Sequence, residues 1–161
     1  MSRSGVTYRI ATPVDAASIE RCRLDDPAAG PADPRMTAYM QGTHHPQQAL
    51  APRVVLVGLS DNQVVGYIAG HLTRRHDCDG ELQYLFVAPH HRRAGVGAEL
   101  LARLSEWFAS QGAHRVCVNV APESAPARAF YAKHGADDLN EYWYVWKDMW
   151  SAIRETARAN P

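Results

Sequence analysis

The sequence predicts an α/β (α+β) fold, in which a mixed, mostly antiparallel central sheet contains one parallel pair of strands and is flanked by helices. Two β-branched runs at 53–58 and 64–70 are joined by a short polar turn, which predicts an antiparallel hairpin. A strand at 81–87, a helix at about 97–110 and a strand at 115–120 follow. Because a strand, a crossover helix and a strand of one sheet form a parallel unit, the last two strands are expected to be parallel neighbours.

The N-terminal third predicts one strand and two helices. Apolar residues alternate over 6–10, as in a strand with one buried face. A helix is predicted over about 12–24, since Thr12 can act as its N-cap and a proline follows. A short helix is predicted over 33–42, and no secondary structure is assigned to 42–52. This unassigned segment lies between a helix and the hairpin, where a substrate-shaping loop is expected.

The C-terminal third predicts one more helix and one more strand after strand 115–120. Ser124 can cap a helix that Gly135 closes. The aromatic run 142–146 predicts a terminal strand that is buried on both faces. Residues 151–161 are expected to be a polar, frayed tail, so residues 1–150 are predicted to form one domain.

The composition argues against several classes of partner. The 161 residues are 46% apolar and 21% charged, as in an ordinary globular protein. Lysine plus arginine and aspartate plus glutamate number 17 each, so no global field favours nucleic acid or an anionic membrane. No apolar run approaches the roughly 20 residues of a membrane span, and the first residues lead into a strand rather than a secretory apolar region. A cytoplasmic location is expected.

The cysteines and histidines predict no metal site. Cys22, Cys78 and Cys117 form no C-x-x-C pair, so reduced, mostly buried thiols are expected. His71 and His76 lie near Cys78 in the chain, but their spacing matches no zinc motif.

A basic, glycine-bearing turn connects strand 81–87 to the next helix, with the sequence Arg92-Arg93-Ala94-Gly95-Val96-Gly97. Its glycines allow a tight turn and the close approach of a ligand, and the N-terminus of the following helix attracts anions. The arginines add bidentate donors for phosphate oxygens. Leu100 stands where a dinucleotide fingerprint needs its third glycine, and the Gly-Lys-Ser/Thr ending of a P-loop is missing. The turn therefore predicts a phosphorylated ligand, with an ordinary basic turn as the alternative.

Two separated motifs resemble those of the GCN5-related N-acetyltransferase (GNAT) superfamily. The turn 92–97 has the Arg-x-x-Gly-x-Gly pattern of its acyl-CoA pyrophosphate loop. The second block is an asparagine at a strand end, Asn119, followed by a helix that carries Phe130-Tyr131-Ala132-Lys133-His134-Gly135. The order of elements agrees over roughly 6–149. The sequence departs from the family pattern at the C-terminus, where one strand is predicted instead of a closing hairpin.

The resemblance implies acetyl-CoA as co-substrate and no metal. In this superfamily the two parallel strands splay apart to admit the pantetheine arm, and helices cover both faces of the sheet. The amides of the arm would pair with the main chain of Leu85 and Val87 on one side and Asn119 on the other. Lys133 would reach the phosphates or the adenine, or else be a solvated lysine. The implied cofactor-binding residues are Leu85, Phe86, Val87, Arg92, Arg93, Ala94, Gly95, Val96, Gly97, Ala98, Asn119 and Lys133.

Two catalytic residues are also implied by the resemblance. Tyr131 matches the tyrosine that protonates the departing thiolate, and a phenol with a pKa of about 10 stays protonated at neutral pH. Glu81 resembles the glutamate that accepts the proton of the amine, directly or through water. The backbone N–H of Val87 is a candidate donor to the oxyanion. The alternatives are an aromatic residue packed on the sheet for Tyr131 and a solvated carboxylate for Glu81.

The predicted function is acetyl transfer from acetyl-CoA to a primary amine by direct attack in a ternary complex. The alternative is a non-catalytic acyl-CoA-binding or regulatory module of the same fold. The acceptor would be a small-molecule amine or a peptide or protein amine, and the resemblance to the superfamily, together with the aromatic terminal strand, implies a homodimer. Several acidic residues could attract a cationic acceptor or simply be solvated: Asp25, Asp26, Asp137, Asp138 and Glu141.

Overall fold

The computed structural model describes residues 5–24, 26–29 and 34–159. Over these residues one seven-stranded sheet has the strand order β1-β2-β3-β4-β5-β7-β6. The strands are β1 Val6–Ile10, β2 Leu50–Ser60, β3 Gln63–Leu72, β4 Gly80–Val87, β5 Val116–Asn119, β6 Asp137–Asn140 and β7 Trp143–Trp146. The helices are α1 Ala16–Leu24, α2 Pro34–Gln41, α3 Val96–Ser110, α4 Ala125–Lys133 and α5 Met149–Ala159. The predicted mixed sheet is confirmed.

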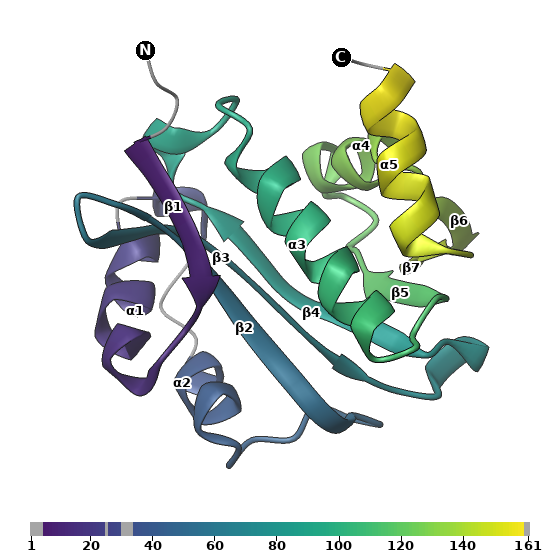
Figure 1. The fold of residues 1–161 in the computed structure, drawn as a ribbon, viewed down its shortest axis with the longest axis horizontal. Helices are drawn as coiled ribbons and strands as arrows, with labels where there is room; N and C mark the ends of the chain where they lie inside the picture. Colours follow the sequence, from purple (N-terminus) through teal and green to yellow (C-terminus); the bar gives the residue numbers. More distant parts are fainter. Residues whose placement is uncertain (1–4, 25, 30–33, 160–161) are drawn as a thin grey trace.

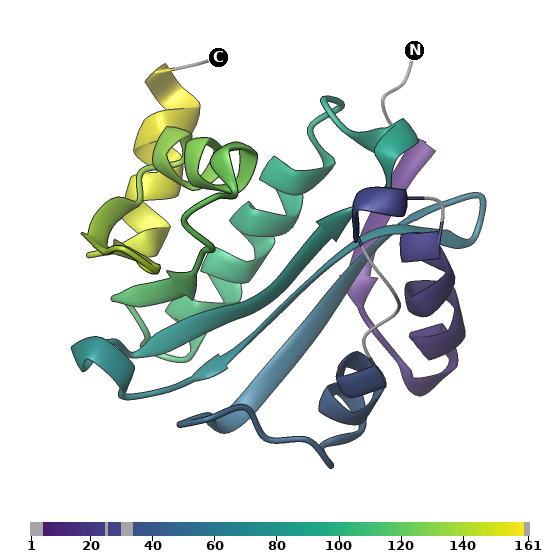
Figure 2. The same ribbon diagram turned by 180° about the vertical axis from the view of Figure 1, so that it is seen from behind.

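One pair of neighbouring strands in this sheet is parallel. Strands β4 and β5 pair from Gly80 opposite Val116 to Leu82 opposite Val118, and the other neighbours are antiparallel. Beyond this short register, residues 83–87 of β4 have no partner in β5. The two strands visibly diverge in Figure 2. One edge of β4 is therefore open where the strand approaches the loop before α3.

Helices cover both faces of the sheet, as Figures 1 and 2 show, with α1 and α2 on one face and α3 and α5 on the other. Ile19 of α1 and Tyr39 of α2 belong to one core cluster, together with Tyr67 of β3. Leu104 of α3 and Ile153 of α5 belong to a second cluster on the opposite face. The alternation of side chains along each strand feeds both clusters.

Glycine in the central strands sets how closely α3 approaches the sheet. A Cβ atom added at Gly70 would lie 2.9 Å from Cζ of Phe108, which is closer than van der Waals contact allows. Leu100 and Phe108 are completely buried at this interface. The close packing fixes the axis of α3, so that its N-terminus lies directly after the open end of β4.

The C-terminus differs from the prediction in two ways. Strand β6 pairs with β7, with Asp137 opposite Val145, so the closing hairpin is present and the prediction of a single strand is wrong. The polar, frayed tail is also wrong as far as residue 159, because α5 begins at Met149 and packs on α3, with Met149 and Ile153 buried. These two residues are four positions apart and form the narrow apolar stripe that the polar composition of this segment hides. The predicted boundary at residue 150 therefore cuts a packed helix.

The observed elements differ from the predicted ones in smaller ways at other places. The helix predicted over 12–24 begins as a 3-10 turn, Pro13–Asp15, and the carboxylate of Asp15 accepts a hydrogen bond of 2.7 Å from the main-chain N–H of Thr12. Strand β2 begins inside the unassigned segment, at Leu50. In β7 the last three residues are buried but Trp143 is only half-buried. The predicted cap at residue 33 lies outside the described residues.

Candidate active site

The open edge of β4 carries main-chain groups that β5 does not use. The N–H of Ala88 donates to the carbonyl oxygen of Val65 in β3 at 2.8 Å. Because the direction of main-chain groups alternates along a strand, the N–H and C=O of Leu85 and Val87 face the other edge, where β5 has diverged. An extended ligand that carries amides could pair there as an added strand would.

The loop after β4 ends in a helix N-terminus that suits an anion. Arg93 and Gly95 both have left-handed backbone conformations, with φ of 61° and 87°. The first main-chain hydrogen bond of α3 runs from Glu99 N–H to the carbonyl oxygen of Gly95, at 3.0 Å. The N–H groups of residues 96–98 thus have no acceptor within the helix, and the positive end of its dipole adds to them.

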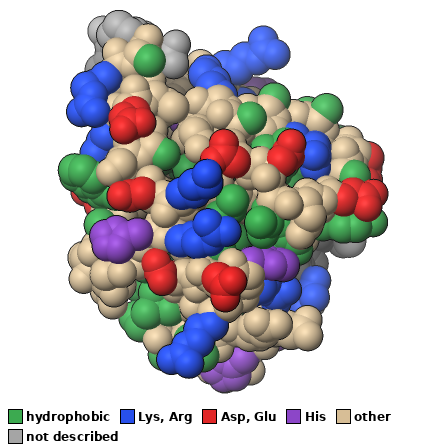
Figure 3. Space-filling model, turned by 90° about the vertical axis from the view of Figure 1, so that its right-hand side faces the viewer, with side chains coloured by type: hydrophobic (Ala, Val, Ile, Leu, Met, Phe, Trp, Pro, Cys, Tyr) green, Lys and Arg blue, Asp and Glu red, His purple; other side chains and the backbone are tan. Residues whose placement is uncertain are grey.

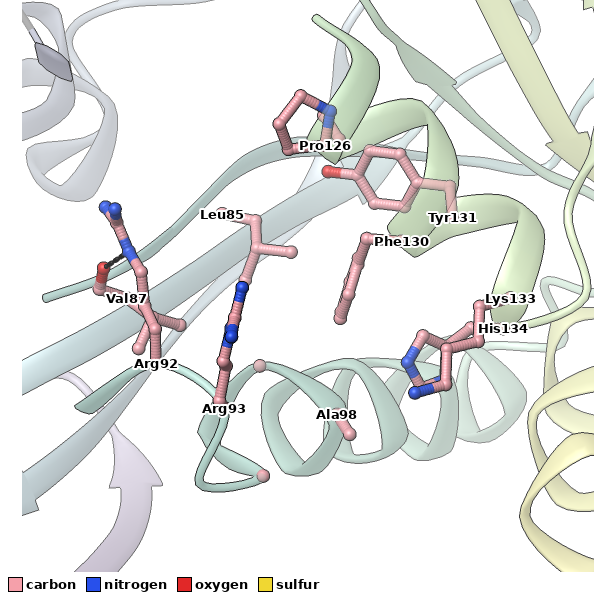
Figure 4. A pocket seen from close by; sticks show the side chains of 13 residues that line it. Leu85, Val87, Arg92, Arg93, Ala98, Pro126, Phe130, Tyr131, Lys133 and His134 are labelled. Atoms are coloured by element: carbon pink, nitrogen blue, oxygen red, sulfur yellow. Dashed lines mark hydrogen bonds between the residues drawn. The ribbon is translucent and has the colours of Figure 1, made fainter. Parts of the chain in front are cut away.

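A cavity of about 580 Å³ lies beside this loop, between β4, α3 and α4 (Figure 4). We call it the Arg93 cavity. It is lined by Leu85, Val87, Arg92, Arg93, Gly95, Gly97, Ala98, Pro126, Ala127, Phe130, Tyr131, Lys133 and His134. Nine of the predicted site residues are among these, which brings the two sequence motifs to one place. Its volume lies within the range of cofactor sites.

The two arginines of the loop have different environments. Arg92 donates from Nε to the carbonyl oxygen of Val87 at 2.7 Å, and its Nη2 lies 2.6 Å from Oδ2 of Asp26. The hydrogen bond from Arg92 is the main reason that the pKa of Asp26 is below its ordinary value. Arg93 points into the cavity instead, toward Leu85 (Figure 4). Arg92 therefore ties the loop to β4 and to the segment after α1, while Arg93 offers its charge to a ligand.

Tyr131 is buried in the wall of the Arg93 cavity. Its ring packs edge-on against Phe130 and Trp146, at centroid distances of 5.5 and 5.7 Å. Its hydroxyl points from α4 toward the Leu85 side of the cavity (Figure 4). Burial raises the pKa of Tyr131, so the phenol keeps its proton at neutral pH and is available as an acid.

Two cationic or titratable side chains stand at the far end of the same cavity. Lys133 and His134 lie near the first turn of α3, on the other side of Phe130 (Figure 4). The His134 ring packs on Phe130 at a centroid distance of 4.5 Å. Burial, and then the neighbouring charge of Lys133, lower the pKa of His134.

Four of the predicted cofactor residues do not line the Arg93 cavity. Phe86 packs on the opposite face of the sheet, under the guanidinium groups of Arg23 and Arg92. Val96 is buried in the core below α3, and Ala94 is an exposed loop residue. Asn119 lines a different cavity, and its Nδ2 donates to the carbonyl oxygen of Tyr142 at 3.1 Å.

Sequence reasoning also missed residues that do line the cavity: Pro126, Ala127, Phe130 and His134. The signal for them was the one-turn spacing on α4, which places these positions on the same helical face as Tyr131.

A second cavity, of about 390 Å³, uses the opposite face of β4. We call it the Glu81 cavity. It is lined by Arg35, His44, His45, Pro46, Gln47, Arg75, Glu81, Gln83, Tyr84, Asn119 and Trp143. These residues come from α2, the 42–49 loop, the β3–β4 turn, β4, β5 and β7. Apart from Glu81 and Asn119 the sequence analysis named none of them as site residues, because no local motif contains them.

Glu81 is at the base of a buried polar chain. Its Oε1 lies 3.6 Å from Nε2 of His71, and the hydroxyl of Tyr39 lies 2.9 Å from Nδ1 of the same imidazole. Burial raises the pKa of Tyr39, so the phenol keeps its proton and donates to Nδ1. The ring proton of His71 then lies on Nε2, which faces Glu81. His71 and Tyr39 are fully buried, and the 3.6 Å separation of Nε2 from Oε1 is longer than a hydrogen bond.

The described residues provide neither a metal-binding cluster nor a membrane-spanning helix. Within residues 5–24, 26–29 and 34–159, no group of three or more histidine, cysteine, aspartate or glutamate side chains could hold a metal ion. In the same part of the chain no helix has the length and apolar composition needed to cross a membrane. Figure 3 shows acidic and basic side chains interspersed on one face of the molecule, without an extended basic stripe there.

The comparisons with known proteins agree with this geometry. A model of the Acetyltransferase (GNAT) family matches residues 22–136. A Mycobacterium tuberculosis protein named as an uncharacterized N-acetyltransferase is 35% identical over 83 residues, which are 52% of this chain and 52% of that protein. The chain thus spans about half the length of the curated relatives it matches first.

Solved structures share the fold at low sequence identity. An acetyltransferase from Thermus thermophilus superposes with a TM-score of 0.67 at 22% identity, over 90% of this chain and 98% of that one. The PaiA N-acetyltransferase of Thermoplasma acidophilum, solved in complex with coenzyme A, superposes with a TM-score of 0.67 at 16% identity, over 91% and 99%. With the sheet, the loop and the family model in agreement over more than half of its length, the chain belongs to the acetyltransferase (GNAT) family.

Proposed function

We propose that this chain is an acetyl-CoA-dependent N-acetyltransferase that transfers the acetyl group directly to a primary amine in a ternary complex. The observation that carries the proposal is the pair of cavities on the two faces of β4, beside the strand edge that β5 leaves open. One cavity has the features of a nucleotide-thioester site, and the other has a buried carboxylate for an amine. The relatives that are named as N-acetyltransferases support an enzymatic function.

The cofactor would lie along the Arg93 cavity. Its diphosphate would accept from the N–H groups at the start of α3 and from Arg93, where charge and dipole act together. The pantetheine amides would pair with the main chain of Leu85 and with the N–H of Val87 along the free edge of β4, since the carbonyl oxygen of Val87 already accepts from Arg92. Phe130 and the alanines of the wall would pack on the apolar parts of the arm. This binding mode uses mostly main-chain groups.

The chemistry would take place where the thioester meets the opening between β4 and β5. The nitrogen of the free amine attacks the carbonyl carbon, and a main-chain N–H of β4 beyond those that pair with the arm donates to the oxygen as negative charge develops there. The carbon–sulfur bond then breaks, and Tyr131 donates its proton to the sulfur. Glu81 accepts the proton that the amine loses, directly or through water.

A preformed acceptor cavity argues against the non-catalytic alternative. A module that only binds acyl-CoA needs no buried carboxylate beside the thioester, yet Glu81 is 5% exposed and lies beside the buried His71 and 3.4 Å from Nε of Arg75. A buried charge with few partners costs folding free energy, so it is retained where it acts on a ligand.

The test is a thiol-release assay with acetyl-CoA and a panel of amines, amino acids and peptide N-termini, next to calorimetry of CoA binding. We expect CoA uptake and acceptor-dependent thiol release. Tight uptake of CoA without release by any acceptor would favour the binding module. The absence of any CoA uptake would refute both functions.

A further inference from the structure

The charges around the Glu81 cavity are not those of a site for a simple polyamine. Among the described residues that line it, Arg35 and Arg75 are cations, His44 and His45 are titratable bases, and Glu81 is the one carboxylate. A ligand with several positive charges would meet like charges on most sides. A ligand with one amine and one anionic group would find a partner for each.

The basic wall is held in place by hydrogen bonds from outside the cavity. Arg53 donates from Nη1 to the carbonyl oxygen of His44 and from Nη2 to Nδ1 of His45, both at 2.7 Å. Because a guanidinium group can only donate, Nδ1 of His45 is the acceptor in this contact. Its ring proton therefore lies on Nε2, so His45 presents a donor as well as its ring to its surroundings.

The loop that carries these histidines is anchored at its far end too. Arg75 donates from Nη2 to the carbonyl oxygen of Gln47 at 2.7 Å, and the hydroxyl of Thr73 donates to that of Gln48 at 3.0 Å. The 42–49 loop is thus fixed by side chains of β2 and of the β3–β4 turn. A fixed wall lowers the ordering cost of binding, so this cavity is suited to a small, defined ligand.

The two signs of charge lie side by side at the base of the cavity. Nε of Arg75 is 3.4 Å from Oε1 of Glu81, and the guanidinium group lies over the Trp143 ring at 4.9 Å from its centroid. Oε1 of Glu81 is buried between Arg75 and His71, and Glu81 still lines the cavity, so its carboxylate is the group there that would pair with a ligand ammonium. A ligand that satisfies both side chains must carry its amine and its anionic group only a few bonds apart.

We propose, on the basis of the N-acetyltransferase function above, that the acceptor is a free amino acid or a close analogue with a carboxylate beside its primary amine. Its amine faces Glu81, and its carboxylate faces Arg75 and the basic wall formed by Arg35, His44 and His45. The volume of about 390 Å³ accommodates a molecule of this size. The remaining lining, Tyr84 and Trp143, is left for the side chain of the amino acid.

The first experiment compares amino acids with the amines that lack only the carboxylate. Suitable pairs are lysine with cadaverine, phenylalanine with phenethylamine, and methionine with 3-(methylthio)propylamine, each assayed by thiol release from acetyl-CoA. We expect kcat/KM to be about 10- to 100-fold higher for the amino acid in at least one pair, as one charge-assisted contact supplies. An amine that reacts as well as or better than its amino acid in every pair overturns the proposal and leaves the N-acetyltransferase function standing.

The second experiment uses two neighbouring arginines as variant and control. Arg75 lines the cavity, whereas Arg74 is exposed and does not line it. Arg75→Gln is expected to lower the ratio of kcat/KM between amino acid and amine about tenfold, and Arg74→Gln to leave that ratio unchanged. An equal effect of both variants, or none from Arg75→Gln, overturns the assignment of the carboxylate end.

Calorimetry decides the case in which no acceptor is turned over. The preformed complex with CoA is titrated with the amino acids of the three pairs. Uptake that Arg75→Gln abolishes supports the proposal, and the absence of uptake overturns it. CoA binding in the same experiment reports independently on the proposed cofactor function.

Discussion

The Arg93 cavity and the Glu81 cavity lie on opposite faces of the same strand, but they are built from different chemistry. The first is lined mainly by small and apolar residues, and main-chain N–H groups at the start of α3 stand beside a few polar side chains there, of which Arg93 points inward. The second is lined by charged and titratable side chains from six segments of the chain. A site made of main-chain groups tolerates substitution, whereas a site made of side chains changes its ligand when those side chains change. If the chain transfers an acetyl group as proposed, main-chain groups would bind the acetyl donor and individual side chains would select the acceptor.

The largest expected effect is at Tyr131, which we propose as the proton donor to the leaving thiolate. Tyr131→Phe removes the phenolic proton and leaves the packing on Phe130 and Trp146 intact. Because burial raises the pKa of Tyr131 and so keeps this proton in place, we expect kcat to fall about 10²- to 10⁴-fold while the Kd of CoA is unchanged. Tyr142→Phe, at a tyrosine that is 51% exposed, is the control and should retain full turnover. An undiminished kcat in Tyr131→Phe would remove this residue from the mechanism.

A substitution at Gly95 tests whether the Arg93 cavity depends on the backbone conformation of its loop. Gly95 has a φ of 87° and no heavy atom within 4 Å of an added Cβ, so a valine there is strained without a clash. The strain of about 1–3 kcal/mol is relieved if the loop moves. The main-chain N–H groups at the start of α3 would then no longer point to the proposed diphosphate site. We expect Gly95→Val to raise the Kd of CoA about tenfold or more.

Gly112 offers a matched control for this strain. Its φ is 74°, and an added Cβ would also meet nothing within 4 Å, but it lies at the opposite end of α3. Gly112→Val should lower the melting temperature about as much as Gly95→Val does, and it should leave CoA binding unaffected. Equal losses of CoA affinity in the two variants would show that the loop has no particular part in binding.

The two arginines of the loop should separate into a ligand-binding and a positioning residue. Arg93→Gln is expected to raise the KM for acetyl-CoA about tenfold and to leave that for acetyl-pantetheine, which lacks the diphosphate, unchanged. Arg92→Gln should affect both substrates, because Arg92 holds the carbonyl group of Val87, and Asp26→Asn should reproduce its effect. Identical profiles for the two arginine variants would contradict this division.

The first cavity was largely predictable from the sequence and the second was not, for a physical reason. The loop motif, the first turn of α3 and the Tyr131 helix are short segments whose chemistry is complete within a few residues, so pattern and spacing predict them. The side chains of Phe86 and Val96 do not line the first cavity, because side-chain alternation and helix rotation turn them into the core. The Glu81 cavity is lined by segments up to about a hundred residues apart in the sequence, such as those of Arg35 and Trp143, and no local pattern encodes their proximity.

The prediction of the fold failed in places for a similar physical reason. The hairpin of β6 and β7 was missed because β6 has the sequence Asp137-Asp138-Leu139-Asn140, which lacks any alternating apolar signal. It is held by pairing with β7, so its structure is determined by the neighbour rather than by its own residues. The acidic pair Asp137 and Asp138, considered as an attraction for a cationic acceptor, lies on this edge strand and does not line the Glu81 cavity.

The smallest expected effect concerns pH and tests whether the far end of the Arg93 cavity meets phosphate. Burial and the charge of Lys133 lower the pKa of His134 in the free protein, so its imidazole is neutral at pH 7. In the absence of ligand the unfolded chain binds this proton more readily, so this residue contributes stability above its ordinary pKa of about 6.5, and that contribution is lost as the pH falls below it. A phosphate bound nearby favours the protonated ring, so binding takes up a proton and CoA affinity should rise a few-fold between pH 8 and pH 6. Because CoA phosphates titrate in the same range, His134→Gln is the control: the part of the pH dependence that this variant removes belongs to the protein. A pH profile that is the same in both proteins would place the phosphates away from His134 and limit the anion site to Arg93 and the first turn of α3.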